Sequence, residues 1–164
     1  MIKLQGIAAA PGIVVSKAYR IGKEEFDIPK KEISQQDIPY EIQLFEEALI
    51  KTRKEIIELQ KRIAADMGQE QAQIFDAHLL VLEDRMLIEE VISRLKKERF
   101  NVAFIFFEVM KKYVEVFSRI EDEYIKERIS DINDVSKRVM RNLLGKKGKW
   151  LEGLTEKVIV VAHD

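Results

Sequence analysis

Apolar positions through the middle of the chain recur with the spacing of α-helices. Between residues 38 and 63 they are separated alternately by four and three residues, which places them on one face of a helix. The members of this stripe are Ile38, Ile42, Phe45, Leu49, Thr52, Ile56, Leu59 and Ile63. The spacing predicts a helix over residues 37–65, capped by Asp37 at its start and stopped by Gly68.

A second helix is predicted over residues 69–99, with two apolar stripes instead of one. The first consists of Phe75, Leu79, Leu82 and Met86, and the second of Ile88, Val91, Ile92 and Leu95. The two stripes are out of phase with each other near residues 83–85. We therefore expect a bend or a change of register at that point.

Two more helices follow. Asn101 is a candidate cap for a helix over 101–117, whose inward side chains are expected to be Ala103, Phe106, Phe107, Met110, Tyr113 and Val114. Acidic residues open a helix over 121–144, which ends at Gly145. Its inward positions are expected to be Ile125, Ile129, Ile132, Val135, Val139 and Leu143.

The two ends of the chain have β character. A short apolar run precedes the turn at Pro11 and Gly12, a β-branched stretch continues to Ile21, and residues 158–162 form an unbroken apolar run of the kind buried within a sheet. The order of strand, helical bundle and strand predicts a mostly α protein, in which a four-helix bundle is inserted between strands of an incomplete α/β domain. The expected divisions are 1–22, 23–145 and 146–164.

The amino-acid composition excludes some classes of function for this chain. The 164 residues include 28 Lys and Arg against 29 Asp and Glu, and the net charge of −1 gives no reason to expect a nucleic-acid or anionic-membrane partner. Cysteine is absent, which excludes disulfides and thiolate metal sites. No apolar run has the length of a signal peptide or a membrane span. These features predict a cytoplasmic protein.

Several sequence motifs, in order along the chain, resemble those of one known family. Residues 9–13 (AAPGI) resemble its A-S-P-G-I/V signature, and residues 74–84 (IFDAHLLVLED) resemble its I-F-x-x-H-x-x-x-L-x-D segment. Residues 122–135 (DEYIKERISDINDV) are similar to its D-x-Y-L-x-E-R-x-x-D-I-x-D-I helix, and the match continues to Gly145. The family is enzyme I, the phosphoenolpyruvate-dependent protein phosphotransferase of the bacterial sugar phosphotransferase system.

The resemblance implies that partner binding and phosphate transfer belong to different parts of the protein. The four helices look like the subdomain that docks the small phosphocarrier protein HPr, and the flanking strands look like part of the swivelling phosphohistidine domain. In the family, phosphoenolpyruvate phosphorylates a histidine in a G-G-x-x-S-H type motif, and the phosphate then passes to HPr. That motif would lie beyond Asp164, and the barrel that binds phosphoenolpyruvate and Mg²⁺ further still. The chain alone is therefore expected to hold no catalytic residue, metal or cofactor and to be inactive.

The resemblance also implies a partner-binding surface on the second and fourth predicted helices. Its residues would be Gln69, Glu70, Gln71, Phe75, His78, Leu80, Val81, Asp84, Arg85, Met86, Leu87 and Arg128. An apolar centre with a charged rim is typical of protein interfaces. The other interpretation of His78 is a partly buried, hydrogen-bonded imidazole. Neither His78 nor His163 has glycine-rich neighbours that could cradle a phosphate, so neither is expected to accept one.

The sequence departs from the family pattern at four of these positions. Arg85 and Met86 stand where acidic residues are common, and Gln69 and Gln71 stand where charged residues are common. Fewer carboxylates should weaken steering of a basic partner. Alternatives are an enzyme I-like module of the dihydroxyacetone kinase type and a structural helical scaffold. The choice between a sugar and a nitrogen-regulatory branch stays open.

Overall fold

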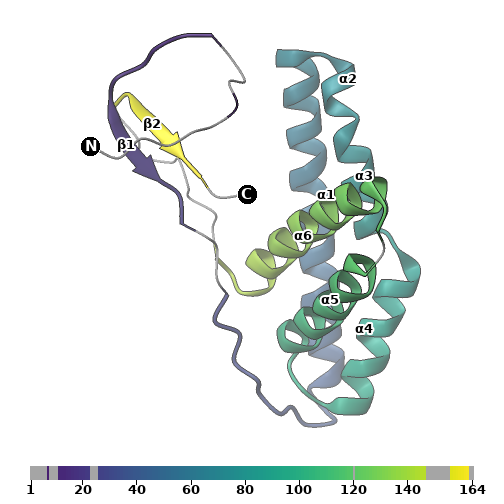
Figure 1. Cartoon of the computed structure of the whole chain (residues 1–164). Coiled ribbons are helices and arrows are strands. Elements are labelled where there is room, and N and C mark those ends of the chain that lie inside the picture. Colours follow the sequence, from purple (N-terminus) through teal and green to yellow (C-terminus); the bar gives the residue numbers. More distant parts are fainter. Residues whose placement is uncertain (1–6, 8–10, 23–25, 120, 147–155, 163–164) are drawn as a thin grey trace. The chain divides into compact units, whose positions relative to one another are not determined.

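The computed structural model describes residues 7, 11–22, 26–119, 121–146 and 156–162, with only the backbone for 123–127 (Figure 1). The chain divides into two compact units. One consists of residues 26–148, and the other combines residues 1–25 with residues 149–164. The larger unit is helical and the smaller one holds a pair of strands.

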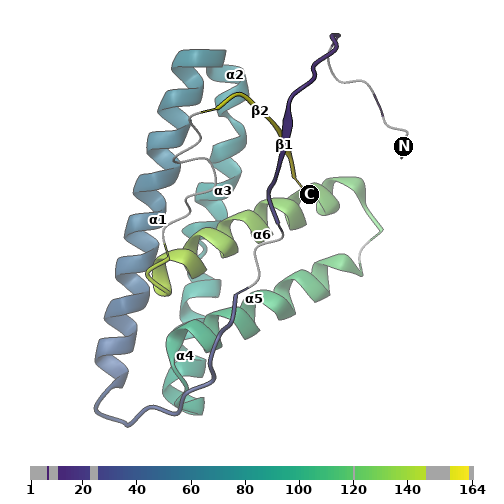
Figure 2. The ribbon, with the colours of Figure 1, turned by 90° about the vertical axis from the view of Figure 1, so that its left-hand side faces the viewer.

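The larger unit is a bundle in which one of four helices is broken into pieces. The long α1 (Ile38–Met67) lies antiparallel to a column made of α2 (Gln69–Ala72), α3 (Ile74–Leu82) and α4 (Arg85–Glu98) (Figures 1 and 2). Helices α5 (Val102–Ser118) and α6 (Glu123–Leu143) pack beside each other and lie obliquely across α1 and the column. The predicted mostly α fold with a four-helix bundle is confirmed.

The predicted single helix over 69–99 is instead three segments. Gly68 separates α1 from α2. Its φ of 109° is one that residues with a Cβ atom rarely adopt. A further break falls at Gln73, between α2 and α3. The expected bend near residues 83–85 is confirmed at Asp84, whose backbone is extended. Its Oδ1 accepts a hydrogen bond from the Leu87 amide at 3.0 Å and so caps α4.

Two predicted helix caps serve other purposes. Asp37 accepts hydrogen bonds from the amide and hydroxyl of Ser34, which lower its pKa, and makes no side-chain bond to α1. Asn101 Oδ1 accepts from the Lys31 amide at 2.9 Å. The first amide of α5, that of Val102, donates instead to Glu41 Oε2 at 2.7 Å. A carboxylate on α1 thus performs the capping role and joins α1 to α5.

The core is built where all the helices meet. The rings of Phe45 and Phe106 lie 5.7 Å apart, and both side chains are buried. The prediction for α5 needs a correction, because Phe107 is 38% exposed whereas Ile105 and Val109 are fully buried. Every residue from 102 to 110 except Glu108 is apolar, so spacing alone could not identify the inward face.

The smaller unit contains a parallel strand pair. Strand β1 (Lys17–Arg20) pairs with β2 (Val158–Val161), with Lys17 opposite Val158. The Ser16 hydroxyl donates to the Lys157 carbonyl at 2.7 Å beside the pair. Parallel strands need a long connection, which here is the helical unit. The run over 158–162 was expected to be buried, yet Val160 and Val161 are each 46% exposed in the two-stranded sheet.

Some sequence features lie outside the described residues, namely Ala9 and Ala10 of the first motif and His163. Within the described part of the chain, no helix combines the length and the apolar character needed to cross a membrane.

Candidate functional site: an apolar groove between four helices

A groove of about 270 Å³ opens between α3, α4, α5 and α6. Its lining residues are Ala77, Leu80, Val81, Asp84, Leu87, Met110, Tyr113, Phe117, Arg128 and Ile132. Most of these side chains are apolar, and the charged ones are a single carboxylate and a single guanidinium. Because the walls come from four elements, the groove exists only when the bundle is folded.

The apolar groups of the groove differ in their exposure. Leu87, Met110 and Ile132 are buried and belong to the core, whereas Leu80 is 68% exposed. Met86, the neighbour of Leu87 in α4, is 76% exposed. Exposed aliphatic side chains beside an apolar depression are typical of a surface that binds another protein.

Three polar side chains line the groove. Asp84 has one oxygen committed to capping α4. Arg128 Nη1 lies 3.8 Å from Asp131 Oδ2, one turn along α6. Burial raises the pKa of the Tyr113 phenol, and the carboxylates of Glu90 and Asp84 raise it further. Tyr113 therefore stays neutral at physiological pH. The groove presents opposite charges and a phenol around an apolar centre.

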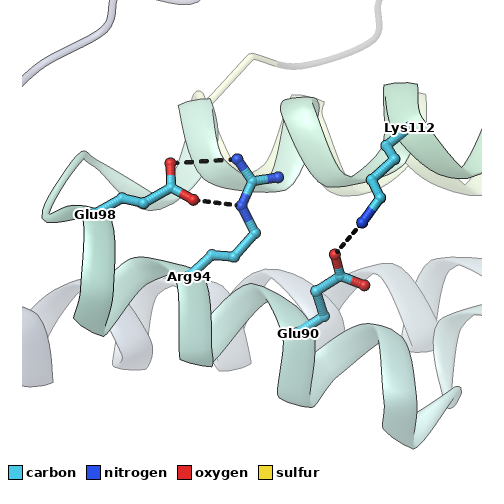
Figure 3. Close-up of polar contacts among 4 residues, drawn as sticks. All are labelled: Glu90, Arg94, Glu98 and Lys112. Carbon is cyan, nitrogen blue, oxygen red and sulfur yellow. Dashed lines mark hydrogen bonds and ion pairs between the residues drawn. The ribbon is translucent and has the colours of Figure 1, made fainter.

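An ion pair joins α4 and α5, which form two walls of the groove. Lys112 Nζ on α5 lies 3.3 Å from Glu90 Oε1 on α4 (Figure 3). Within α4, Arg94 donates two hydrogen bonds to Glu98, at 2.6 Å and 3.2 Å. This bidentate contact raises the pKa of Arg94 and lowers that of Glu98. Such partly exposed pairs stabilise by about 0.2–1 kcal/mol each.

His78 lies close to the groove residues in sequence but is not among those that line the groove. It is 6% exposed, and its Nδ1 is 3.0 Å from the Ile74 carbonyl oxygen. Its Nε2 lies 3.9 Å from Asp131 Oδ1, and its ring centroid lies 5.6 Å from that of Phe75. The structure thus shows a buried imidazole with a backbone partner, in accord with the second interpretation of this residue.

The structure brings five of the twelve predicted site residues together in the groove. They are Leu80, Val81, Asp84, Leu87 and Arg128. The remaining ones lie outside the groove, on α2, α3 and α4. Gln69, Glu70 and Gln71 are exposed on α2, and Gln69 lines a separate polar hollow between α1 and α2. Phe75 is half-buried, and the exposed Arg85 pairs with Glu89 at 2.6 Å.

Sequence reasoning missed the contribution of α5 to this site. The spacing predicts Met110 and Tyr113 as inward residues and Phe117 as the end of the helix. The pair of aromatic residues four positions apart, Tyr113 and Phe117, was the available signal. Their ring centroids are 6.5 Å apart, and both side chains are only half-buried.

Metal binding is not supported by the described side chains. In that part of the chain, no three His, Asp or Glu side chains come together as ligands for one ion.

Comparison with known proteins gives consistent matches. The family model described as "PEP-utilising enzyme, N-terminal" matches residues 5–128 of the chain. The phosphoenolpyruvate-protein phosphotransferase of Bacillus subtilis is 37% identical over 164 residues, and that of Staphylococcus aureus is 34% identical over 161 residues. The match covers 100% and 98% of this chain, respectively, but only 28% of each relative's length.

Solved structures agree with this result. An NMR solution structure of Enzyme I (nEIt) superposes with a TM-score of 0.79 at 37% identity, and covers 99% of this chain and 65% of that one. The N-terminal domain of Enzyme 1 – Nitrogen has a TM-score of 0.68 at 24% identity, covering 85% of this chain and 58% of that one, and supports the fold alone.

Proposed function

The chain belongs to the PEP-utilising enzyme N-terminal family, and from this premise we propose that it is the amino-terminal, HPr-docking part of a phosphoenolpyruvate-protein phosphotransferase. The whole protein would be a cytoplasmic transferase of the phosphotransferase system for sugar transport. It would take phosphate from phosphoenolpyruvate onto a histidine and pass it to HPr. The part played by this chain is to hold HPr while that transfer occurs.

The groove between α3, α4, α5 and α6 is the observation that carries this proposal. Residues that resemble the family's docking motifs come from α3, the start of α4 and α6, and they line one depression. An apolar centre flanked by Asp84 and Arg128 can bury an aliphatic side chain of HPr and pair with charges around it. Contacts to Leu80 and Met86 would extend this surface, because both side chains are exposed.

The chemical step is proposed to reside in residues other than those described. His78 is poorly suited to accept a phosphate, since the imidazole is buried and one nitrogen is bonded to the Ile74 carbonyl. The acceptor histidine and the magnesium-dependent site for phosphoenolpyruvate are assigned to other parts of the full-length protein. Incubation of this chain alone with phosphoenolpyruvate and Mg²⁺ should give no phosphohistidine.

Titration of isotope-labelled HPr from the same organism with this chain tests the docking proposal. A carrier must arrive and leave at each turnover, so we expect micromolar affinity, roughly −8 kcal/mol. Met86→Asp would place a charge in the interface and should weaken binding by about 1–3 kcal/mol. Ile50→Asp is the matched control, because Ile50 is equally apolar and 69% exposed but lies on α1, which does not line the groove.

Two results would contradict the proposal. One is the absence of HPr signal shifts at hundreds of micromolar of the chain. The other is equal loss of affinity in the Met86→Asp and Ile50→Asp variants, which would mean that binding does not use the groove. A further variant, Arg85→Glu, should raise the association rate with a basic HPr, and the gain should be larger at low salt.

A further inference from the structure

We propose that Asp131 is a positioning residue for Arg128 at the groove, and that the buried ring of His78 packs behind Asp131 and limits its movement. The inference rests on the proposed function, because it concerns the same docking groove. It assigns a role to two side chains that are not among those that line the groove.

The first link is the fixed imidazole of His78. A carbonyl oxygen only accepts, so the contact with the Ile74 oxygen at 3.0 Å requires a hydrogen on His78 Nδ1. The His78 side chain is 7% exposed and packs beside Phe75, so the ring has little freedom to turn. Its Nε2 edge is thereby aimed at α6, where it meets Asp131 Oδ1 at 3.9 Å.

The second link is the Asp131 carboxylate, which lies between two cationic or potentially cationic groups. One oxygen faces His78 and the other faces Arg128, with Nη1 at 3.8 Å. The Asp131 side chain is 15% exposed, whereas that of Arg128 is 34% exposed. Exposure therefore increases from His78 through Asp131 to Arg128, and only the last of the three lines the groove.

The third link is the effect on Arg128. A free arginine loses much rotamer freedom when a partner immobilises it, and this loss weakens binding. A carboxylate one turn away on the same helix restricts the guanidinium before the partner arrives. Asp131 also offsets the positive charge of Arg128, which lessens the repulsion of a basic partner. Both effects favour docking, and the first operates only through the Arg128 side chain.

A double-mutant cycle separates positioning from a general effect of charge. Asp131→Asn keeps the shape of the side chain and removes its charge, and Arg128→Gln removes the guanidinium. In the otherwise unchanged chain, Asp131→Asn should weaken HPr binding about three- to tenfold. In the Arg128→Gln background the same change should alter the dissociation constant by less than about 1.5-fold. A purely structural or long-range electrostatic role would give the same factor in both backgrounds and would overturn the proposal.

Variants of His78 test the supporting link. His78→Leu fills similar space behind Asp131 and should keep most of the affinity for HPr. His78→Ala leaves that space empty and should weaken binding, by no more than Asp131→Asn does. Thermal unfolding by circular dichroism shows whether each variant is folded. Equal affinity of His78→Ala and the unmodified chain would remove His78 from the mechanism.

One measurement requires no variant and no partner. In the unmodified chain, side-chain NMR relaxation should show the Arg128 guanidinium to be more ordered than that of Arg62, which is exposed on α1. Equal mobility of the two would overturn the inference. If HPr does not bind the unmodified chain at all, the proposed function fails, and the ordering of Arg128 is still decided by this measurement.

Discussion

Replacing Thr52 with valine tests how α1 is joined to α6. Thr52 is fully buried in the middle of α1, and its hydroxyl donates to the Ala48 carbonyl at 2.8 Å. The same hydroxyl accepts a hydrogen bond from Asn142 Nδ2 on α6 at 2.9 Å. Valine has nearly the same shape and a similar helix propensity, so Thr52→Val removes the hydroxyl function with little other change.

The expected cost follows from what each partner loses. The Ala48 carbonyl keeps its helical backbone bond, and the Asn142 amide keeps a contact with Glu55 Oε2 at 3.3 Å. The loss is thus two hydrogen bonds of the buried hydroxyl, about 0.5–1.5 kcal/mol each, although both partners keep another contact. The added methyl group offsets up to about 0.8 kcal/mol. Thr52→Val should destabilise the helical unit by about 1 kcal/mol.

Urea unfolding followed by far-ultraviolet circular dichroism measures this change, which corresponds to a shift of about 4 °C in Tm. Thr52→Ser serves as the control, because it keeps the hydroxyl and loses only a methyl group. Asn142→Ala completes a cycle, in which Thr52→Val should have a smaller effect once the amide is gone. A Thr52→Val chain as stable as the unmodified one, with additive effects in the cycle, would refute the hydrogen-bonded link.

Three further outcomes are expected. Phe45→Ala should cost about 3–5 kcal/mol of unfolding free energy because the ring is fully buried, and a loss below about 0.5 kcal/mol would contradict its place in the core. Arg99→Gly should stabilise the unit by about 0.5–1 kcal/mol, since Arg99 ends α4 with a φ of 56°, whereas Arg99→Ala should bring no such gain. Glu98→Gln should be slightly less stable than the unmodified chain above pH 4.5. The Arg94 hydrogen bond lowers the folded-state pKa of Glu98, so this difference should vanish as the pH falls through that pKa; a pH-independent difference would argue against the pair.

Helix positions were predictable where a single apolar stripe is sharply defined. The four-three spacing located α1 and correctly included the buried Thr52, although its hydrogen bond to Asn142 could not be inferred from periodicity. The two apolar stripes of residues 69–99 are out of phase near Asp84, and the helix is indeed broken at that residue. The break at Gln73 had no comparable signal, because the residue is neither glycine nor proline and the stripe on either side is short.

The candidate site was only partly predictable. Periodicity identifies which face of a helix is apolar, but it does not reveal which faces meet. Leu80, Asp84 and Arg128 were grouped through family resemblance and not through spacing. Tyr113 and Phe117 were missed because α5 is apolar over most of its length, so a groove wall and a core face look alike in the sequence.

The parallel pairing of β1 with β2 has a consequence for the order of events on the ribosome. Lys17 and its partner Val158 are separated by nearly the whole sequence. All helices of the larger unit are translated before β2, so the bundle can begin to fold while β1 still lacks its neighbour. The amino-terminal strand must wait, unpaired and prone to associate with other strand edges, until that distant segment arrives. Rapid folding of the helices would shorten the time that β2 needs to find β1, because it replaces the long flexible loop between the two strands by a compact unit.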